Sequence, residues 1–243
     1  FGVPVTDFDT VFLGIGAEST RIGTPTGIPN SYFLYRETYG ASSLSLPVTL
    51  GWARDARDSA LAPTAGRYQR INFEWSFAGD VRYLRTNLQH QEYWQLPFKM
   101  SLGINAELGL GKGLGGRPFP IFKNFYGGGL GSVRGFEQGS LGVIDPTGAF
   151  IGGAKKLNIN AELYFPVPGT GNDKSLRIFA FADTGNVWRE DEKMSASQLR
   201  ASAGLGLSWI SPVGPLKLSW AAPLRAQPND RIQRFQFQIG TAF

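Results

Sequence analysis

The feature that most constrains this chain is a period of two in its side chains, with apolar and polar residues alternating along segment after segment. Residues 98–110 read FKMSLGINAELGL, with an apolar residue at each even position and a polar residue or glycine at each odd one. Successive side chains of a β-strand point to opposite faces, so a period of two is typical of strands. This segment is therefore predicted to be a strand with one apolar and one polar face.

The same alternation recurs along the chain and predicts about ten strands. It is clear in 98–110, 157–165, 199–209, 215–224 and 235–243, and weaker in 11–19, 44–54, 67–79, 82–96 and 175–188. Turn signals rich in glycine and proline separate these segments, for example at 169–173 and 211–214. Only 31–39, SYFLYRETY, fits a short helix, and that helix would lie in a loop. The fold class is therefore all-β.

A soluble sandwich also alternates, so the period alone does not decide which face meets solvent. Three features favour a membrane barrel, in which the apolar face meets lipid. The polar registers carry Gly, Ser, Asn and Gln rather than the Lys and Glu that coat soluble sheets, and charged residues are only 18% of the chain. The clear segments reach nine to thirteen residues, enough to cross a bilayer. Aromatic residues gather near strand ends, at Trp52, Trp75, Trp94, Trp188, Trp209, Trp220 and Phe243. We predict a transmembrane antiparallel β-barrel, with a soluble all-β protein as the alternative.

Composition argues against several other classes. The chain has no Cys, which excludes disulfides, Cys-ligated zinc and thiol catalysis. Its one histidine, His90, lies on the apolar register of 82–96, a poor place for the base of a hydrolase. The net charge is +5, but the 24 Lys and Arg are dispersed without a basic run, so we expect no nucleic-acid partner. The opening FGVPVTDFDT lacks the features of a signal peptide and reads as mid-domain sequence, so we expect a fragment or a processed product.

A segment of about forty residues, 114–153, separates two predicted strands. It contains GGGLGSVRGFEQGSLG, in which Arg134 stands among glycines, and it also carries many apolar side chains. A loop of this length and composition is predicted to pack against something rather than to be disordered. We expect it to fold inward, so that Arg134 pairs with carboxylates on polar registers such as Glu107, Glu162 and Asp183. A hydrolytic pair of carboxylates is the alternative interpretation of these acidic residues.

The motifs resemble those of the Omp85 superfamily. VRGF, at Val133, Arg134, Gly135 and Phe136, is followed in order by KLNINAELYFP at 156–166, FADTGNVW at 181–188, GPLKLSWAAPL at 214–224 and FQFQIGTAF at 235–243. VRGF alone is moderately specific, whereas the motifs in this order are highly specific. They are similar to the barrel of outer-membrane assembly factors of a betaproteobacterial, neisserial type, and the resemblance covers essentially the whole chain.

The resemblance implies a non-enzymatic function in the bacterial outer membrane: folding and inserting other β-barrel proteins through a lateral gate. It implies no cofactor. The implied partners are nascent outer-membrane β-barrel proteins, accessory lipoproteins that bind the periplasmic POTRA region, and outer-membrane lipid and lipopolysaccharide. The family barrel has about sixteen strands, so 1–243 would be its C-terminal part, without POTRA domains and the first strands. A secretion pore of the two-partner type is the alternative function.

The resemblance also implies roles for particular residues. Arg134 is expected to point into the lumen, where Glu162 and Asp183 stand at the positions of the family's wall carboxylates. Asp183 shares its register with Phe179 and Phe181, so the two faces of that strand are less distinct. The terminal strand matches the signal that marks barrel proteins as clients, and Gly240 fits weak pairing at the gate. The residues of that strand are Phe235, Phe237, Ile239, Gly240 and Phe243.

Overall fold

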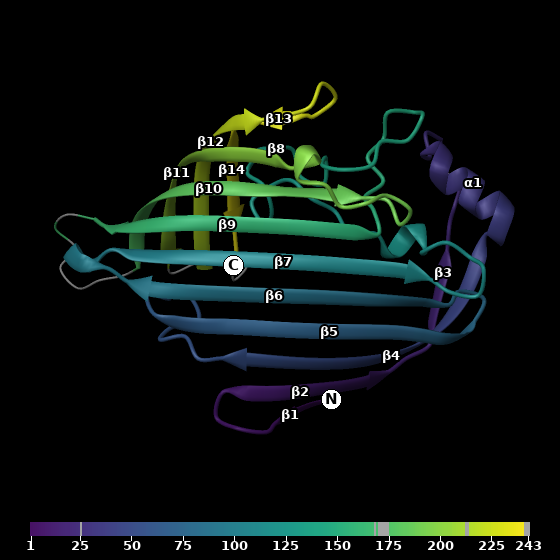
Figure 1. The fold of residues 1–243 in the computed structure, drawn as a ribbon, viewed down its shortest axis with the longest axis horizontal. Coiled ribbons are helices and arrows are strands. Elements are labelled where there is room, and N and C mark those ends of the chain that lie inside the picture. Colours follow the sequence, from purple (N-terminus) through teal and green to yellow (C-terminus); the bar gives the residue numbers. More distant parts are fainter. Residues whose placement is uncertain (25, 168, 170–174, 212–213, 241–243) are drawn as a thin grey trace.

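A computed structural model describes residues 1–24, 26–167, 169, 175–211 and 214–240. One antiparallel sheet dominates it, with strand order β1-β2-β4-β5-β6-β7-β9-β10-β11-β12-β14 and with β3 paired to β4 (Figure 1). The strands of this sheet are β1 (Gly2–Pro4), β2 (Asp9–Ile15), β3 (Glu18–Arg21), β4 (Ser42–Asp55), β5 (Gly66–Gly79), β6 (Tyr83–Gln95), β7 (Ser101–Gly113), β9 (Lys155–Pro166), β10 (Leu176–Trp188), β11 (Arg200–Ser211), β12 (Gly214–Arg225) and β14 (Phe235–Ile239).

The remaining elements are small. Strands β8 (Gly135–Phe136) and β13 (Ile232–Gln233) pair with each other outside the main sheet. Helix α1 (Asn30–Tyr39) and the 3₁₀ turns η1 (Pro97–Lys99), η2 (Ile121–Lys123) and η3 (Ala196–Gln198) lie in the connections. Within the described residues, no helix has the length and apolar character needed to cross a membrane.

All ten predicted strands and the short helix are present, which confirms the all-β fold class, but some boundaries differ. The strand expected over 98–110 begins only at Ser101, because Phe98 and Lys99 take left-handed φ angles of 61° and 58° in the preceding turn. The strand expected over 11–19 is split into β2 and β3. Gly16, between β2 and β3, donates its N–H to the oxygen of Pro47 on the neighbouring β4 at 2.9 Å. Pro47 has no N–H to donate in return, so the ladder is interrupted there.

The two faces of the sheet have the inverted polarity of a membrane barrel. One face carries exposed apolar side chains, including Leu50, Ile71, Phe73, Trp75, Phe77, Trp94, Leu110, Ile159, Ile178, Leu205, Trp209, Trp220, Phe235, Phe237 and Ile239. The other face carries buried polar side chains, including Ser76, Gln91, Ser101, Asn158, Asn160, Asp183, Ser202, Ser208, Lys217, Ser219 and Gln236. A soluble sheet would show the opposite arrangement, so lipid is the medium that suits the apolar face.

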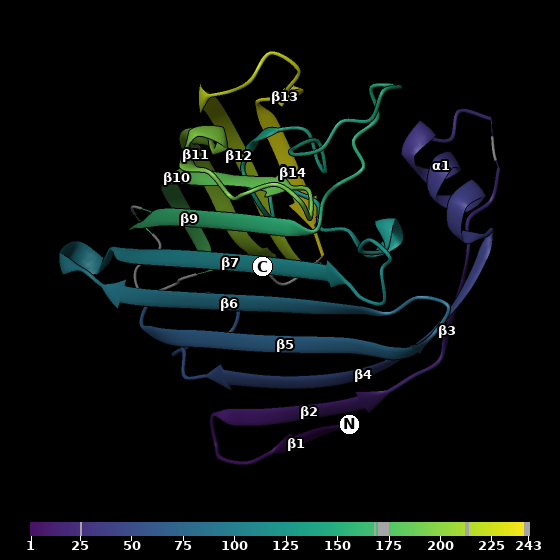
Figure 2. The same cartoon turned by 45° about the vertical axis from the view of Figure 1, so that its right-hand side comes forward.

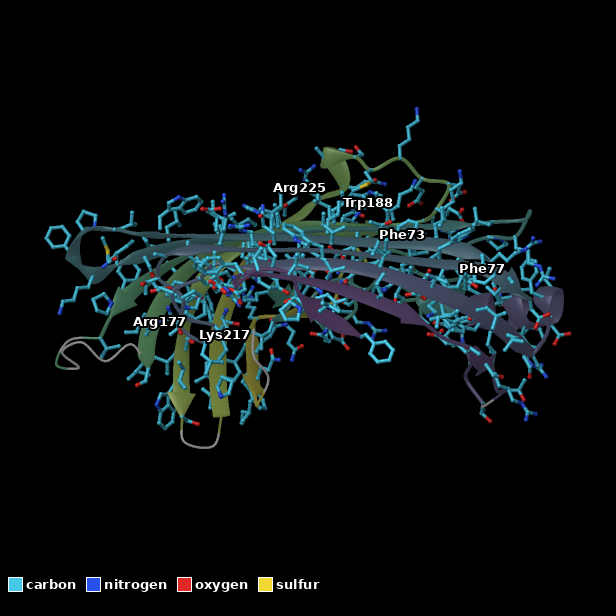
Figure 3. The ribbon with its side chains drawn as sticks, turned by 90° about the horizontal axis from the view of Figure 1, so that it is seen from below. Phe73, Phe77, Arg177, Trp188, Lys217 and Arg225 are labelled. Atoms are coloured by element: carbon cyan, nitrogen blue, oxygen red, sulfur yellow. The ribbon has the colours of Figure 1, made fainter. Side chains whose placement is uncertain are left out.

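The sheet curls into a trough whose concave side is the polar one (Figures 2 and 3). Strands β10–β14 turn steeply away from β4–β7. Figure 3 labels Phe73 and Phe77, which belong to the apolar face, and Arg177 and Lys217, which are buried on the concave side. Strands β1 and β14 are the two ends of the strand order, and no pairing joins them in the part of the chain that the structure describes. Within the described residues, β14 pairs with β12 alone.

Candidate functional site: the lumenal loop and its ion pairs

The connection between β7 and β9, residues 114–154, folds onto the concave side of the sheet, as predicted from its apolar content (Figure 2). Val133, Phe136 and Leu141 form a cluster inside it and are completely buried. The loop closes on itself through an isolated bridge between Gly127 and Leu141. This loop, called the lumenal loop below, is therefore an ordered plug with its own small core.

Arg134 joins the lumenal loop to the inner face of the sheet through ion pairs. Its Nε and Nη2 donate to the two carboxylate oxygens of Asp183 at 2.7 and 2.6 Å, and its backbone N–H donates to the same carboxylate at 3.0 Å. Its Nη1 donates to Glu162. Asp183 lies on β10 and Glu162 on the neighbouring β9, so the sheet presents both carboxylates to one guanidinium. Only 1% of the Arg134 side chain is exposed.

Two further wall residues complete this charge network. Lys217 of β12 donates from Nζ to Glu162 at 2.8 Å, and the Tyr164 hydroxyl donates to the other oxygen of Glu162. Two cations thus face two carboxylates. Such a group is weak evidence for stability when whole, but removing one member leaves a buried charge without a partner. The network therefore favours the one position of the lumenal loop in which all four charges are paired.

Amides join the lumenal loop to the same carboxylates. Asn160 of β9 donates from Nδ2 to Asp183 at 2.8 Å and to the backbone oxygen of Ser132 at 2.6 Å. The Ser132 hydroxyl donates to Asn158 at 3.1 Å. These bonds satisfy polar groups that would be costly to bury alone. Together with the bonds of Arg134, they fix the loop on both sides of Val133.

Aromatic rings hold the guanidinium from the side. The Arg134 Cζ lies 3.7 Å from the ring centroid of Phe181 and 5.5 Å from that of Phe179. These rings face the lumen because glycines on β11 leave room for them: a Cβ at Gly204 would lie 2.7 Å from Phe181, and one at Gly206 would collide with Phe179. Aromatic and acidic side chains share the lumen-facing register of β10 because the two inward rings make cation–π contacts with Arg134. These two rings are called the aromatic seat below.

The charge of Arg134 is secured by this environment. Burial alone would lower the pKa of its guanidinium. The charge of Glu162 and the hydrogen bonds to Asp183 outweigh burial and raise that pKa above its ordinary value. The environment of Arg134 therefore favours its charged form.

The other end of the lumenal loop is fastened at the rim. Lys123 lies 2.7 Å from a carboxylate oxygen of Glu18 and 2.8 Å from one of Glu74. Asp145 accepts a hydrogen bond from the backbone N–H of Ser31 at 3.1 Å. That bond caps helix α1, whose own N-cap residue, Pro29, supplies no side-chain bond. The apolar side of α1 packs on the loop through Tyr35, Ile121, Val143 and Ile151.

The terminal strand carries its predicted apolar residues on the membrane face. Phe235, Phe237 and Ile239 are 58%, 63% and 55% exposed. Gly240 follows the strand with a φ of 87°, and its N–H donates to the backbone oxygen of Pro215 at 2.9 Å. The strand expected over 235–243 ends at Ile239 in the described residues, and Phe243 lies outside them.

The structure thus brings Val133, Arg134, Gly135 and Phe136 together with Glu162 and Asp183 into one site. Glu107 is elsewhere: Lys156 donates to it at 2.8 Å, in a separate pair. His90 lies on the outer face, near Gln69 and Glu92.

Several site residues were not predicted as such. Lys217 and Asn160 stand on polar registers, and that signal was available in the sequence. Phe179 and Phe181 share the register of Asp183, but that signal was ambiguous because aromatic residues in a membrane strand normally indicate lipid contact.

Comparisons with known proteins agree with this geometry. Residues 1–243 match the Omp85 superfamily domain. The outer membrane protein assembly factor BamA of Neisseria meningitidis serogroup B is 38% identical, over 99% of this chain and 35% of that protein. The sorting and assembly machinery component 50 homolog B of Xenopus laevis is 31% identical, over 87% of this chain and 48% of that protein.

A solved structure shows the same architecture. The crystal structure of BamA from Haemophilus ducreyi lacking POTRA domains 1–3 aligns with a TM-score of 0.86 at 25% identity, covering 97% of this chain and 52% of that one. This chain thus spans about a third of the neisserial relative and half of the solved chain. Its match over the full length and its identity to the neisserial protein show that the chain belongs to the Omp85 superfamily.

Proposed function

We propose that this chain is the C-terminal part of the barrel of a BamA-type assembly factor, which folds and inserts β-barrel proteins into the bacterial outer membrane. In this proposal the remaining barrel strands and the POTRA domains belong to the rest of the protein. The partners are nascent outer-membrane proteins, accessory lipoproteins bound to the POTRA region, and the lipid and lipopolysaccharide around the barrel. In this proposal the function is not enzymatic.

The observation that carries the proposal is the position of β14 at the end of the strand order, paired within the described residues with β12 alone, in a sheet whose outer face is apolar. Backbone groups along an open edge can pair with an added strand, which is the physical basis of β-augmentation. In hydrocarbon such groups are costly until they are paired. An incoming strand of a client protein supplies those partners, so the edge acts as a template.

The dimensions of the terminal strand favour insertion next to it. Within the described residues β14 has five residues, whereas a tilted strand needs about 9–11 to cross the hydrocarbon. A short apolar span is accommodated by local thinning of the bilayer. The membrane beside β14 is therefore the place where a client strand meets the lowest barrier.

Arg134 has a supporting role in this proposal. Its ion pairs hold the lumenal loop against β9 and β10, and the loop occupies the concave side behind the terminal strands. The seated loop keeps the polar wall folded while the outer edge remains available.

Reconstitution tests the function. The full-length protein carrying these residues is placed in liposomes, an unfolded outer-membrane protein is added, and its folding is followed by heat-modifiable gel mobility. We expect faster folding than in liposomes with an unrelated closed barrel, and the folded client should be embedded in the membrane. Equal rates in the two preparations, or client passed into the vesicle interior as a secretion pore would do, contradict the proposal.

A further inference from the structure

The terminal strand is much shorter than its neighbour. β12 has twelve residues, but β14 pairs only with its first part, from Leu216 opposite Ile239 to Trp220 opposite Phe235. Beyond that point β12 continues to Arg225. The chain that precedes β14 must therefore leave the edge of the sheet.

That preceding segment pairs with the VRGF motif instead. Ile232 lies opposite Phe136, and Gln233 lies opposite Gly135, in the two-stranded pair of β13 and β8 (Figure 1). The backbone N–H of Glu137 extends the pair by donating to the oxygen of Arg231 at 2.9 Å. At the junction, the N–H of Ala221 on β12 donates to the oxygen of Arg234 at 2.9 Å. The backbone ladder thus passes from the main sheet onto the lumenal loop.

Gln236 joins the terminal strand to the same motif. It is the lumen-facing residue between Phe235 and Phe237 and is only 5% exposed. Its Nε2 donates to the backbone oxygen of Phe136 at 2.7 Å. The terminal clasp, as we name it, consists of the β8–β13 pair and this Gln236 bond.

Gly135 allows the close approach on which the terminal clasp depends. Its φ of 89° is left-handed, and an added Cβ would lie 3.0 Å from the Cβ of Ala221. The backbone of the lumenal loop therefore lies directly against β12, next to the point where β14 begins.

A buried ion pair also holds the segment 226–234, which connects β12 to β14. Arg200 of β11 donates from Nη2 to Asp230 at 2.8 Å and from Nε at 3.0 Å, and it also donates to Asn186 at 2.8 Å. Only 1% of the Asp230 side chain is exposed. The segment between β12 and β14 is thus held at Asp230 as well as at β13.

The sequence of this segment suits the clasp better than the sheet. If the β12–β14 register continued upward, Gln233 would stand opposite Ala222 and Arg231 opposite Leu224, on the membrane face. Polar side chains there are unfavourable. Pairing with the lumenal loop instead keeps the side chains of Gln233 and Arg231 away from the lipid.

We propose that Gln236 and the β8–β13 pair are positioning elements of the terminal strand, so that the seating of Arg134 also sets the order of the edge on which client strands pair. The proposal rests on the assembly function proposed above. Arg134 and Gly135 are adjacent in the chain, so one motif contacts the wall carboxylates and the terminal segment together. If the ion pairs of Arg134 with Glu162 and Asp183 break and the loop moves, its contacts with β13 and Gln236 are disturbed as well.

Hydrogen–deuterium exchange of the full-length protein in lipid nanodiscs tests this coupling. Gln236→Leu removes the bond to Phe136 without touching the ion pairs, and Arg134→Ala unseats the loop without touching Gln236. Each is expected to speed amide exchange over 232–239 at least about fivefold, the effect of losing about one net hydrogen bond. Cross-linking of a client to the terminal strand is expected to fall in parallel, while heat-modifiable mobility shows that the barrel is folded.

Two control variants change similar side chains elsewhere. Gln91→Leu alters a buried lumenal glutamine whose bonds go to Arg57 and Tyr93, and Lys123→Gln frees the loop only at its rim. Both should leave exchange over 232–239 unchanged. Equal exchange in Gln236→Leu and Gln91→Leu overturns the proposal, and so does faster exchange with unaltered client capture. Failure of the unaltered protein to fold clients would instead contradict the assembly function itself.

Discussion

Arg134 and Asp183, which are 49 positions apart in the sequence, share three hydrogen bonds, two from the guanidinium and one from the backbone N–H. The bonds fix both the side chain and the main chain of the VRGF motif against β10. Asp183 has no exposed side-chain surface. This pair therefore sets the position of the lumenal loop inside the sheet.

Loss of the guanidinium should loosen the lumenal loop. Arg134→Ala leaves Asp183 buried without its cation, which typically costs about 3–5 kcal/mol. We expect limited proteolysis to cut within 114–154 in the variant but not in the parent protein. Arg231→Ala is the matched control, because Arg231 is exposed and contacts the loop at its surface, through a 3.7 Å pair with Glu137 and a cation–π contact with Phe150. A loop that stays protected in Arg134→Ala contradicts this role for the ion pairs.

The aromatic seat should be sensitive to crowding from β11. Gly206→Ala places a methyl group in the space of Phe179, and overpacking of this kind typically costs about 1–3 kcal/mol. The melting temperature, read from heat-modifiable mobility, should fall. Gly131→Ala should leave it unchanged, because no atom lies within 4 Å of an added Cβ there. An equal effect of both substitutions would show that Phe179 has room to move.

Docking of helix α1 should depend on the charge of Asp145. Burial raises the pKa of this carboxyl, but hydrogen bonds from Thr147, Ser31 and Ala149 outweigh burial and lower it. A lowered pKa contributes stability that is present above the unfolded aspartate value and is lost as the pH falls through the folded one. We expect amide exchange in 30–39 to rise only on acidification below the ordinary aspartate range.

Asp145→Ala should remove that dependence and raise exchange in 30–39 about fivefold at neutral pH, in line with about 1 kcal/mol for a lost N-cap. The control is Glu37→Gln, an exposed acid on the same helix that forms an ion pair with its neighbour Arg36. If the two variants behave alike, Asp145 does not cap the helix.

Local periodicity made most of the sheet predictable. Side chains alternate on a strand whatever its partners are, so the register of 157–165 placed Glu162 on the polar face without knowledge of the fold. Boundaries at Ser101 and at the split between β2 and β3 were missed, because they depend on a turn at Phe98 and on Pro47 of the neighbouring strand.

Contacts between residues far apart in the sequence could not be predicted from the periodicity of single segments. Phe179 and Phe181 face inward because Gly204 and Gly206 lie on the next strand, and no local pattern reports a neighbour's missing side chain. The capping of α1 by Asp145 joins residues 114 positions apart. The pairing of Gly135 with Gln233 likewise joins two segments whose own sequences give no sign of each other.

The central claim is that client strands pair at the edge of β14. A photo-cross-linking amino acid at Phe237, on the membrane face of β14, tests it in the full-length protein during client folding. The control position is Phe73, which is also exposed on the membrane face but lies on β5, inside the sheet. Cross-links to the client from position 237 and not from position 73 are the predicted result. Equal cross-linking from the two positions, or none from position 237 while clients fold, would contradict it.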